Sequence, residues 1–114
     1  MTFKQYIDGA WVDAVGGGTW DLVNPATETV LTTLPFGDER DARRAVDAAA
    51  DALAAWSKRT AWERGEVLER AAEVVSAHLD EFARITTEEA GKPFKEARAE
   101  WSGVPQYLRW SAEE

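Results

Sequence analysis

The chain has 114 residues, enough for one domain of ordinary size and too few for two. Hydrophobic residues make up 45% of it and charged residues 30%, which argues against an intrinsically disordered tail. The formal net charge of -8 disfavours nucleic acid and anionic membranes as direct partners, and the absence of cysteine excludes disulfides, thiolate metal sites and thiol nucleophiles.

The first residues, MTFKQY, include no apolar stretch of the kind found in signal peptides. No later segment approaches the roughly 20 apolar residues that span a membrane. We therefore expect a cytoplasmic protein with no membrane partner.

Residues 1–36 are predicted to form two β hairpins. In the first, residues 3–7 pair with residues 10–12, because the Asp8-Gly9 dipeptide between them can adopt the positive φ angles of a tight turn. Four strands as short as these bury little surface by themselves, so a helix is expected to cover one face.

The second hairpin follows the Gly16-Gly17-Gly18 loop. Its first strand begins at Trp20 and ends before Asn24-Pro25, and residues 29–34 form the returning strand. The three glycines match neither nucleotide-binding spacing, and no helix begins directly after them, so we interpret them as a flexible turn rather than a phosphate loop.

Asp38 is predicted to cap a helix that runs to about Lys58. Asp41 falls at the third helical position, where a carboxylate favours the positive end of the helix. The apolar residues of this helix recur at spacings of three and four and form one stripe: Ala42, Ala45, Val46, Ala49, Ala52, Leu53 and Trp56. Because alanine dominates the stripe, we expect another element to pack closely against it.

A long second helix is predicted between two strong local signals. It begins at the capping box Thr60-Ala61-Trp62-Glu63, and Gly91 can close it in the left-handed conformation before Pro93. The expected buried face consists of Leu68, Ala71, Ala72, Val75, Leu79 and Phe82, widened by Val67, Val74 and Ile85. His78 is expected to be a half-buried residue within this helix and not a catalytic base.

A third helix is predicted from about Phe94 onward. Its apolar side comprises Ala97, Trp101, Val104, Leu108 and Ser111. Pro105 lacks the amide that would bond to the Trp101 carbonyl, so a kink or a break is expected between Trp101 and Val104. Short antiparallel strands followed by three helices place the chain in the α+β class.

Several short motifs carry a family resemblance: Tyr6-Ile7-Asp8-Gly9-Ala10-Trp11, Asn24-Pro25-Ala26-Thr27, Gly91-Lys92-Pro93, Glu96-Ala97, Trp110 and Ala112-Glu113-Glu114. Together they resemble the aldehyde dehydrogenase superfamily over the whole chain. The resemblance implies that residues 1–114 are the N-terminal portion of the family's α/β cofactor-binding domain, with hairpins in 1–36 and helices in 38–114. We expect the chain to be truncated at its C-terminal end, because no helix stop signal follows Trp110.

The resemblance also implies a function, the NAD(P)-dependent oxidation of an aldehyde to a carboxylic acid. In the family, the catalytic cysteine, the general-base glutamate and the nicotinamide-binding crossover lie beyond a segment of this kind. No catalytic or cofactor-binding residue is therefore predicted here, and the chain alone is expected to be inactive and to bind neither NAD nor NADP. Its role would be that of a structural scaffold.

The expected partner is the remainder of an aldehyde dehydrogenase chain or a second copy, in a homo-oligomer that acts on a small aldehyde. Six tryptophans support this expectation, since each ring buries about 150–250 Å² and several exposed together mark a partner surface. The alternative function is a free-standing helical interaction module that self-associates.

Two sites carry over from the family onto matching residues. Many members hold a monovalent cation, Na⁺ or K⁺, which here would contact the main-chain carbonyls of Leu22 and Val23 and the carboxylate of Glu89. The alternative is that Glu89 simply faces water. The last helix lines the aldehyde's entry tunnel in the family, and the small residues Ala99 and Gly103 would widen that tunnel. Alternatively, Gly103 relieves a kink at Pro105.

Overall fold

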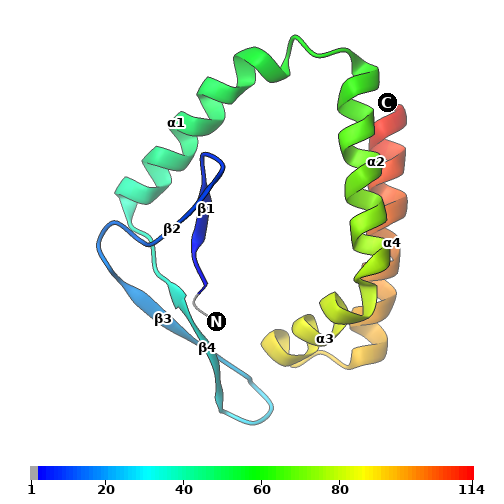
Figure 1. The fold of residues 1–114 in the computed structure, drawn as a ribbon. Helices are drawn as coiled ribbons and strands as arrows, with labels where there is room; N and C mark the ends of the chain where they lie inside the picture. Colours follow the sequence, from blue (N-terminus) through cyan, green and yellow to red (C-terminus); the bar gives the residue numbers. More distant parts are fainter. Residues whose placement is uncertain (1–2) are drawn as a thin grey trace. The chain divides into compact units, whose positions relative to one another are not determined.

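The computed structural model describes residues 3–114 and contains four strands and four helices (Figure 1). Its contacts divide the chain into two units. The first holds the chain up to Val23 together with Glu28–Lys58, and the second holds Asn24–Thr27 together with Arg59–Glu114. The antiparallel hairpins confirm the predicted α+β class. None of the described helices is long and apolar enough to cross a membrane.

The first hairpin of the first unit joins β1 (Gln5–Ile7) to β2 (Ala10–Val12). Asp8 and Gly9 adopt φ angles of 54° and 73°, as the tight turn requires. Tyr6 lies opposite Trp11, and their ring centroids are 5.0 Å apart. The predicted hairpin and its turn are therefore confirmed.

The second hairpin joins β3 (Thr19–Val23) to β4 (Val30–Pro35). The strands are antiparallel, and the Thr33 hydroxyl donates to the Asp21 carboxylate at 2.7 Å. The pairing register shifts between Leu22 and Val23, at the end of β3. Strand β3 follows the glycine loop directly, which confirms that the loop is a turn and not the start of a helix.

Helix α1 (Glu39–Trp56) begins at the predicted N-cap. The Asp38 carboxylate accepts from the Arg40 amide at 2.8 Å, and Arg40 also donates from its guanidinium. These hydrogen bonds, with the charge of Arg40, lower the pKa of Asp38 to about 2. Asp41 is buried, and its carboxylate accepts from the backbone amides of Asp38 and Val15.

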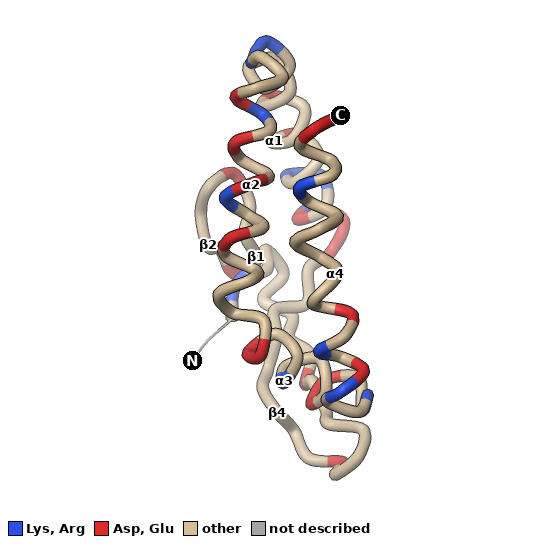
Figure 2. Tube along the Cα trace, turned by 90° about the vertical axis from the view of Figure 1, so that its right-hand side faces the viewer, with Lys and Arg blue, Asp and Glu red and all other residues tan. Residues whose placement is uncertain are grey.

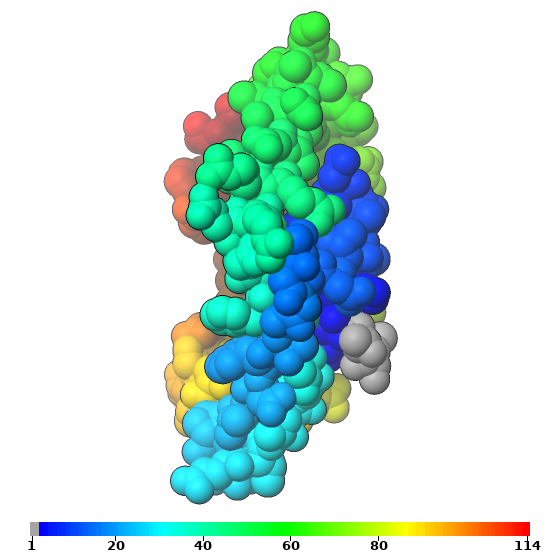
Figure 3. Space-filling view, turned by 90° about the vertical axis from the view of Figure 1, so that its left-hand side faces the viewer, coloured from blue at the N-terminus to red at the C-terminus, as the bar shows by residue number. Residues whose placement is uncertain are grey.

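The alanine-rich stripe of α1 was expected to pack closely against another element, but only part of the stripe does so. Val46 and Leu53 are 67% and 61% exposed. In the space-filling view the residues of α1 lie at the surface along the helix (Figure 3). Beside the β1–β2 turn, four alanines of the helix border a groove that is open to solvent. The stripe therefore has more apolar surface than this unit covers.

In the second unit, α2 (Ala61–Ala77) and α4 (Phe94–Glu113) lie side by side (Figure 1). They run antiparallel, since Gly65 near the start of α2 meets the Ala112 carbonyl near the end of α4. A Cβ atom at position 65 would stand 3.0 Å from that carbonyl oxygen. The absence of a side chain at Gly65 thus permits the close approach of the two helices.

The predicted long helix is divided at His78, and this corrects the expectation of three helices. Helix α3 (Leu79–Ala90) starts immediately after His78, whose amide bonds to the carbonyls of both Val74 and Val75. The backbone of His78 departs from helical geometry, with φ of -112° and ψ of 16°. Its side chain is 55% exposed and contacts Glu81 at 3.0 Å. His78 is thus an exposed residue at the boundary between two helices, and the expected place inside one helix was wrong.

Helix α4 continues across Pro105 without the expected break. Pro105 is buried, as is Ala97, and Trp101, Val104 and Leu108 are half-buried on the same side. The packing of this side offsets the loss of one helical hydrogen bond at the proline. Ser111, expected on this side, is exposed.

The capping box at the start of α2 provides a first prediction. The Thr60 hydroxyl accepts from the Glu63 amide at 3.2 Å, and the Glu63 carboxylate accepts from the Thr60 amide at 2.8 Å. We expect Thr60→Ala to lower the free energy of unfolding of the helical unit by about 0.5–2 kcal/mol. Thr60→Ser keeps the hydroxyl and is the control in a urea titration followed by circular dichroism. Equal urea midpoints for the two variants would show that this cap contributes nothing.

Candidate functional site

The outer face of α4 carries the two predicted tunnel residues. Ala99 and Gly103 are four positions apart, so they share one face of the helix, and both are exposed. Ala97 and Trp101 lie on the opposite face, which packs against the other helices of the unit. A Cβ atom added at Gly103 would meet nothing within 4 Å. The surface over Gly103 is therefore open in the described structure.

The backbone gives no reason for a glycine at position 103. The positive-φ glycines of the described chain lie elsewhere, and α4 is continuous through this residue. Further along the helix, Tyr107 and Trp110 are 67% and 57% exposed, and their rings meet edge to face at 5.8 Å. The outer face thus has small residues at Ala99 and Gly103, followed by the aromatic pair Tyr107 and Trp110. Sequence periodicity alone did not identify this pair.

The inner face of α4 is held against α3 by Trp101. The Trp101 ring stacks on Phe82 with centroids 4.7 Å apart, and its Nε1 donates to the Thr86 hydroxyl at 2.8 Å. Arg98 adds an exposed ion pair with Asp80 at 2.8 Å. In Figure 2, acidic and basic positions are interspersed along the helices of this unit, as this pair illustrates.

Because the backbone at Gly103 is helical and uncrowded, its replacement provides a second prediction. We expect Gly103→Ala to raise the free energy of unfolding of the helical unit by about 0.5–1 kcal/mol, since alanine loses less backbone entropy in a helix. Gly65→Ala is the matched control and should be destabilising, because its Cβ would meet the Ala112 carbonyl oxygen at 3.0 Å. Urea titrations of both variants test the pair. A destabilised Gly103→Ala would mean that this position needs glycine for the fold.

The predicted cation ligands fall in different units. Leu22 and Val23 lie at the end of β3, where the register shifts, and Glu89 is an exposed residue of α3. Over the described residues, no group of three or more His, Asp or Glu side chains gathers as a metal site. That finding concerns side chains and not the predicted main-chain carbonyls, so the ligand set stays a prediction.

Two of the sequence motifs meet within the second unit. Gly91 ends α3 with φ of 67°, and the Pro25 Cγ atom lies 2.9 Å from the position that a Cβ at Gly91 would occupy. The loop around Pro25 is itself a compact turn, because the Asn24 Oδ1 atom accepts from the Ala26 amide at 2.8 Å. Sequence reasoning identified both motifs but did not predict this direct contact between Pro25 and Gly91.

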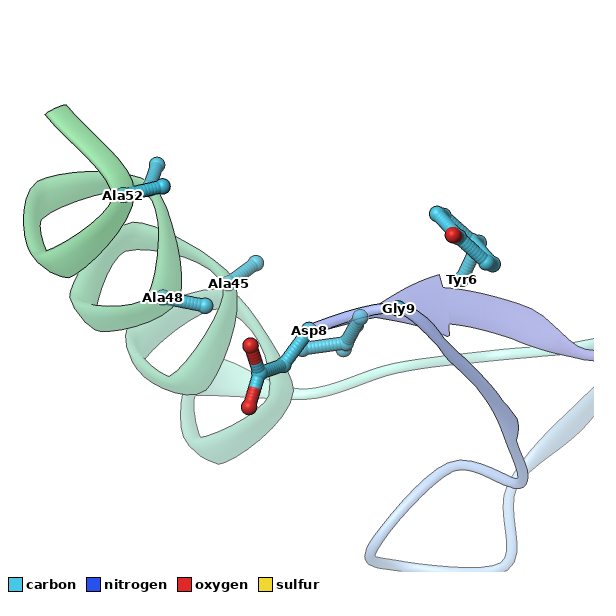
Figure 4. A pocket seen from close by; sticks show the side chains of 8 residues that line it. Tyr6, Asp8, Gly9, Ala45, Ala48 and Ala52 are labelled. Atoms are coloured by element: carbon cyan, nitrogen blue, oxygen red, sulfur yellow. The ribbon is translucent and has the colours of Figure 1, made fainter. Parts of the chain in front are cut away.

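The groove of the first unit is lined by few reactive side chains. It has a volume of about 320 Å³ and is bordered by Tyr6, Ile7, Asp8, Gly9, Ala45, Ala48, Ala49 and Ala52 (Figure 4). Among these lining residues, Asp8 is the one formal charge. Methyl groups, one carboxylate and one phenol supply no nucleophile with an adjacent base. The groove is better suited to packing than to catalysis.

Comparisons with known proteins agree with one another. A sequence profile described as the aldehyde dehydrogenase family matches residues 11–114. The chain is 42% identical to a glutarate-semialdehyde dehydrogenase of Pseudomonas putida and 40% identical to an NADP⁺ succinate-semialdehyde dehydrogenase of Escherichia coli. Each alignment covers 98% of this chain and 24% of the relative.

Solved structures give the same result. The fold is similar to that of betaine aldehyde dehydrogenase from Staphylococcus aureus in complex with NAD⁺, with a TM-score of 0.95 and 32% sequence identity. The match covers 99% of this chain and 23% of that structure. The chain thus spans about a quarter of the length of these relatives.

Proposed function

The chain belongs to the aldehyde dehydrogenase family, and we propose that it forms the N-terminal portion of the cofactor-binding domain of an NAD(P)-dependent enzyme that oxidises an aldehyde to a carboxylic acid. The observation that carries the proposal is the match of nearly the whole fold to an NAD⁺-bound relative. Hairpins in residues 1–36 and helices in residues 38–114 would act as scaffold.

The chemistry itself would depend on residues outside these 114. Oxidation of an aldehyde by this family needs a cysteine thiolate, and the present sequence has no cysteine. NAD or NADP would accept the hydride when bound. Gly16-Gly17-Gly18 does not fit the phosphates of such a cofactor, because strand β3 and not a helix N-terminus follows it. We therefore expect the chain alone to be inactive.

Its contribution to the reaction would be one wall of the aldehyde's entry tunnel. The outer face of α4 supports this role, because Ala99 and Gly103 leave open space where neither the backbone nor the packing requires small residues. A wall with only a methyl group at Ala99 and no side chain at Gly103 would admit a bulkier aldehyde than one with large residues. The aromatic pair Tyr107 and Trp110 would border the same face.

A monovalent cation would be held by the main-chain carbonyls of Leu22 and Val23 and by Glu89. Oxygen donors suit a hard cation such as Na⁺ or K⁺. The register shift between Leu22 and Val23 supports the proposal, since an irregular strand end leaves carbonyl groups outside the regular ladder. The exposed Glu89 carboxylate would supply the charge.

The chain's partner would be the remainder of an aldehyde dehydrogenase polypeptide, within a homo-oligomer. Many large apolar side chains of the described chain are exposed, including Phe36, Leu53, Trp62, Tyr107 and Trp110. Its buried apolar residues are Ile7, Pro105 and four alanines, and no large side chain in residues 3–114 is fully buried. Covering such surface is worth roughly 25 cal/mol per Å². The alternative of a free-standing module has no support in the comparisons, whose reported relatives are dehydrogenases.

A chimera tests the proposal. Residues 1–114 would replace the corresponding quarter of the Pseudomonas putida glutarate-semialdehyde dehydrogenase, to which they align over nearly their whole length. We expect the chimera to reduce the nicotinamide cofactor in the presence of glutarate semialdehyde. The same enzyme without this quarter is the matched control and should be inactive.

Two outcomes would contradict the proposal. One is a folded chimera that binds the cofactor but oxidises neither glutarate semialdehyde nor any of a series of aldehydes. The other is cofactor reduction by the purified 114-residue chain above a buffer blank, which would place a catalytic site within these residues.

A further inference from the structure

Helix α4 presents two faces with different environments within four residues. Trp101 lies midway in sequence between Ala99 and Gly103, but its side chain is half-buried against α3, whereas Ala99 and Gly103 are exposed. Because the helix is continuous through this segment, the direction of Trp101 determines the direction of the opposite face. The contacts that hold Trp101 in place therefore also determine the direction in which the face with Ala99 and Gly103 points.

Two contacts a helical turn apart on α3 hold the Trp101 ring. Phe82 stacks on the ring at 29° between planes, with centroids 4.7 Å apart, and this fixes the plane of the indole. The Thr86 hydroxyl accepts the single indole donor at 2.8 Å, and this fixes the direction of the ring within that plane. A stacked ring with a directed hydrogen bond resists rotation more than stacking alone.

The structure describes two side-chain hydrogen bonds between α3 and α4 within residues 3–114. The Arg98–Asp80 pair is exposed, and exposed ion pairs contribute little to geometry or stability. The Trp101–Thr86 bond is part-buried. The burial makes it the stronger constraint, because its breakage would leave polar groups away from water.

We propose that Trp101 and Thr86 form a positioning pair, which sets the rotation of α4 about its own axis and so the aim of the face that carries Ala99 and Gly103. The proposal deepens the proposed function and depends on it, since that face would line the aldehyde's path. Side chains lie about 5–6 Å from a helix axis, so a rotation of about 20° would move this wall by about 2 Å. A change of that size alters which aldehydes fit.

A matched pair of threonines allows a sharp test. Thr86→Val removes the hydroxyl that accepts from Trp101. Thr87→Val removes a hydroxyl of the same helix that is buried and has no hydrogen-bond partner among the described residues. The two substitutions make the same chemical change at adjacent positions, so Thr87→Val controls for the loss of a threonine hydroxyl at this part of α3, and Thr86→Val alone removes the Trp101 contact.

In the chimera, we expect Thr86→Val to raise KM about three- to tenfold for an aldehyde of the preferred size, with kcat little changed. The ratio of kcat/KM between short and long aldehydes should shift as well. Thr87→Val should leave both quantities as in the parent chimera. Equal KM values and equal size preference for the two variants would overturn the positioning role and leave the proposed function intact.

Nuclear magnetic resonance on the 114-residue chain provides a second test that requires no activity. In Thr86→Val we expect the Overhauser contacts between Phe82 and Trp101 to weaken and the amide shifts of Ala99 and Gly103 to move, while the contacts within α4 persist. In Thr87→Val these signals should stay in place. Unchanged Phe82 contacts and unchanged amide shifts in Thr86→Val would overturn the proposal even if the chimera proved inactive.

Discussion

Replacement of Gly91 by alanine is expected to lower the free energy of unfolding of the helical unit by about 2–4 kcal/mol, for two independent reasons. Gly91 has φ of 67°, a left-handed conformation in which a Cβ crowds the backbone and costs about 1–2 kcal/mol. The new methyl group would also stand 2.9 Å from the Pro25 Cγ atom. A urea titration followed by circular dichroism at 222 nm measures the loss.

The double variant Pro25→Ala with Gly91→Ala separates these two reasons. Alanine at position 25 has no Cγ atom, so the contact with the new methyl group is relieved while the backbone strain stays. The double variant should therefore lose less stability than the sum of the single variants, with a coupling energy of about 1 kcal/mol. Strict additivity would show that Pro25 does not contact this turn in solution.

Much of the fold could be predicted from the sequence, because the residues that form its turns and cap its helices act locally. Asp8-Gly9 specifies a tight turn, Asp38 and Thr60 cap helices, and Gly91 closes one, and each acts through a neighbour a few residues away. The break at His78 was missed because no glycine or proline marks it. The amide of His78 is instead shared between the carbonyls of Val74 and Val75, and no particular residue type is needed for that arrangement.

The candidate site shows the same division between local and distant information. The family resemblance pointed to Ala99 and Gly103, which share one face of α4, and the structure puts that face toward solvent. The contacts that position this face join residues far apart in sequence, such as the bond from Trp101 to Thr86. No sequence spacing predicts such pairs, because the two residues come together only when the chain folds.

Asp41 is a residue whose importance the sequence shows only in part. Its position in the first turn of α1 predicts a favourable charge at the helix terminus. The structure adds a distant partner, because the Val15 amide donates to both carboxylate oxygens at 3.1 and 3.2 Å. The Asp38 amide donates to the same carboxylate at 3.1 Å, which completes the capping box. One side chain thus joins the loop before β3 to the start of α1.

We expect Asp41→Ala to lower the free energy of unfolding of the first unit by about 3–6 kcal/mol, because two backbone amides lose a charged acceptor and each such bond is worth about 1.5–3 kcal/mol. Asp41 is 3% exposed, so little water reaches the site to replace the carboxylate. Asp47→Ala, on the exposed side of the same helix, is the matched control and should change stability by less than about 0.5 kcal/mol. Hydrogen exchange of the Val15 and Asp38 amides measures the effect directly. Both amides should lose protection in Asp41→Ala and keep it in Asp47→Ala, whereas equal protection in the two variants would mean that the carboxylate does not hold this loop.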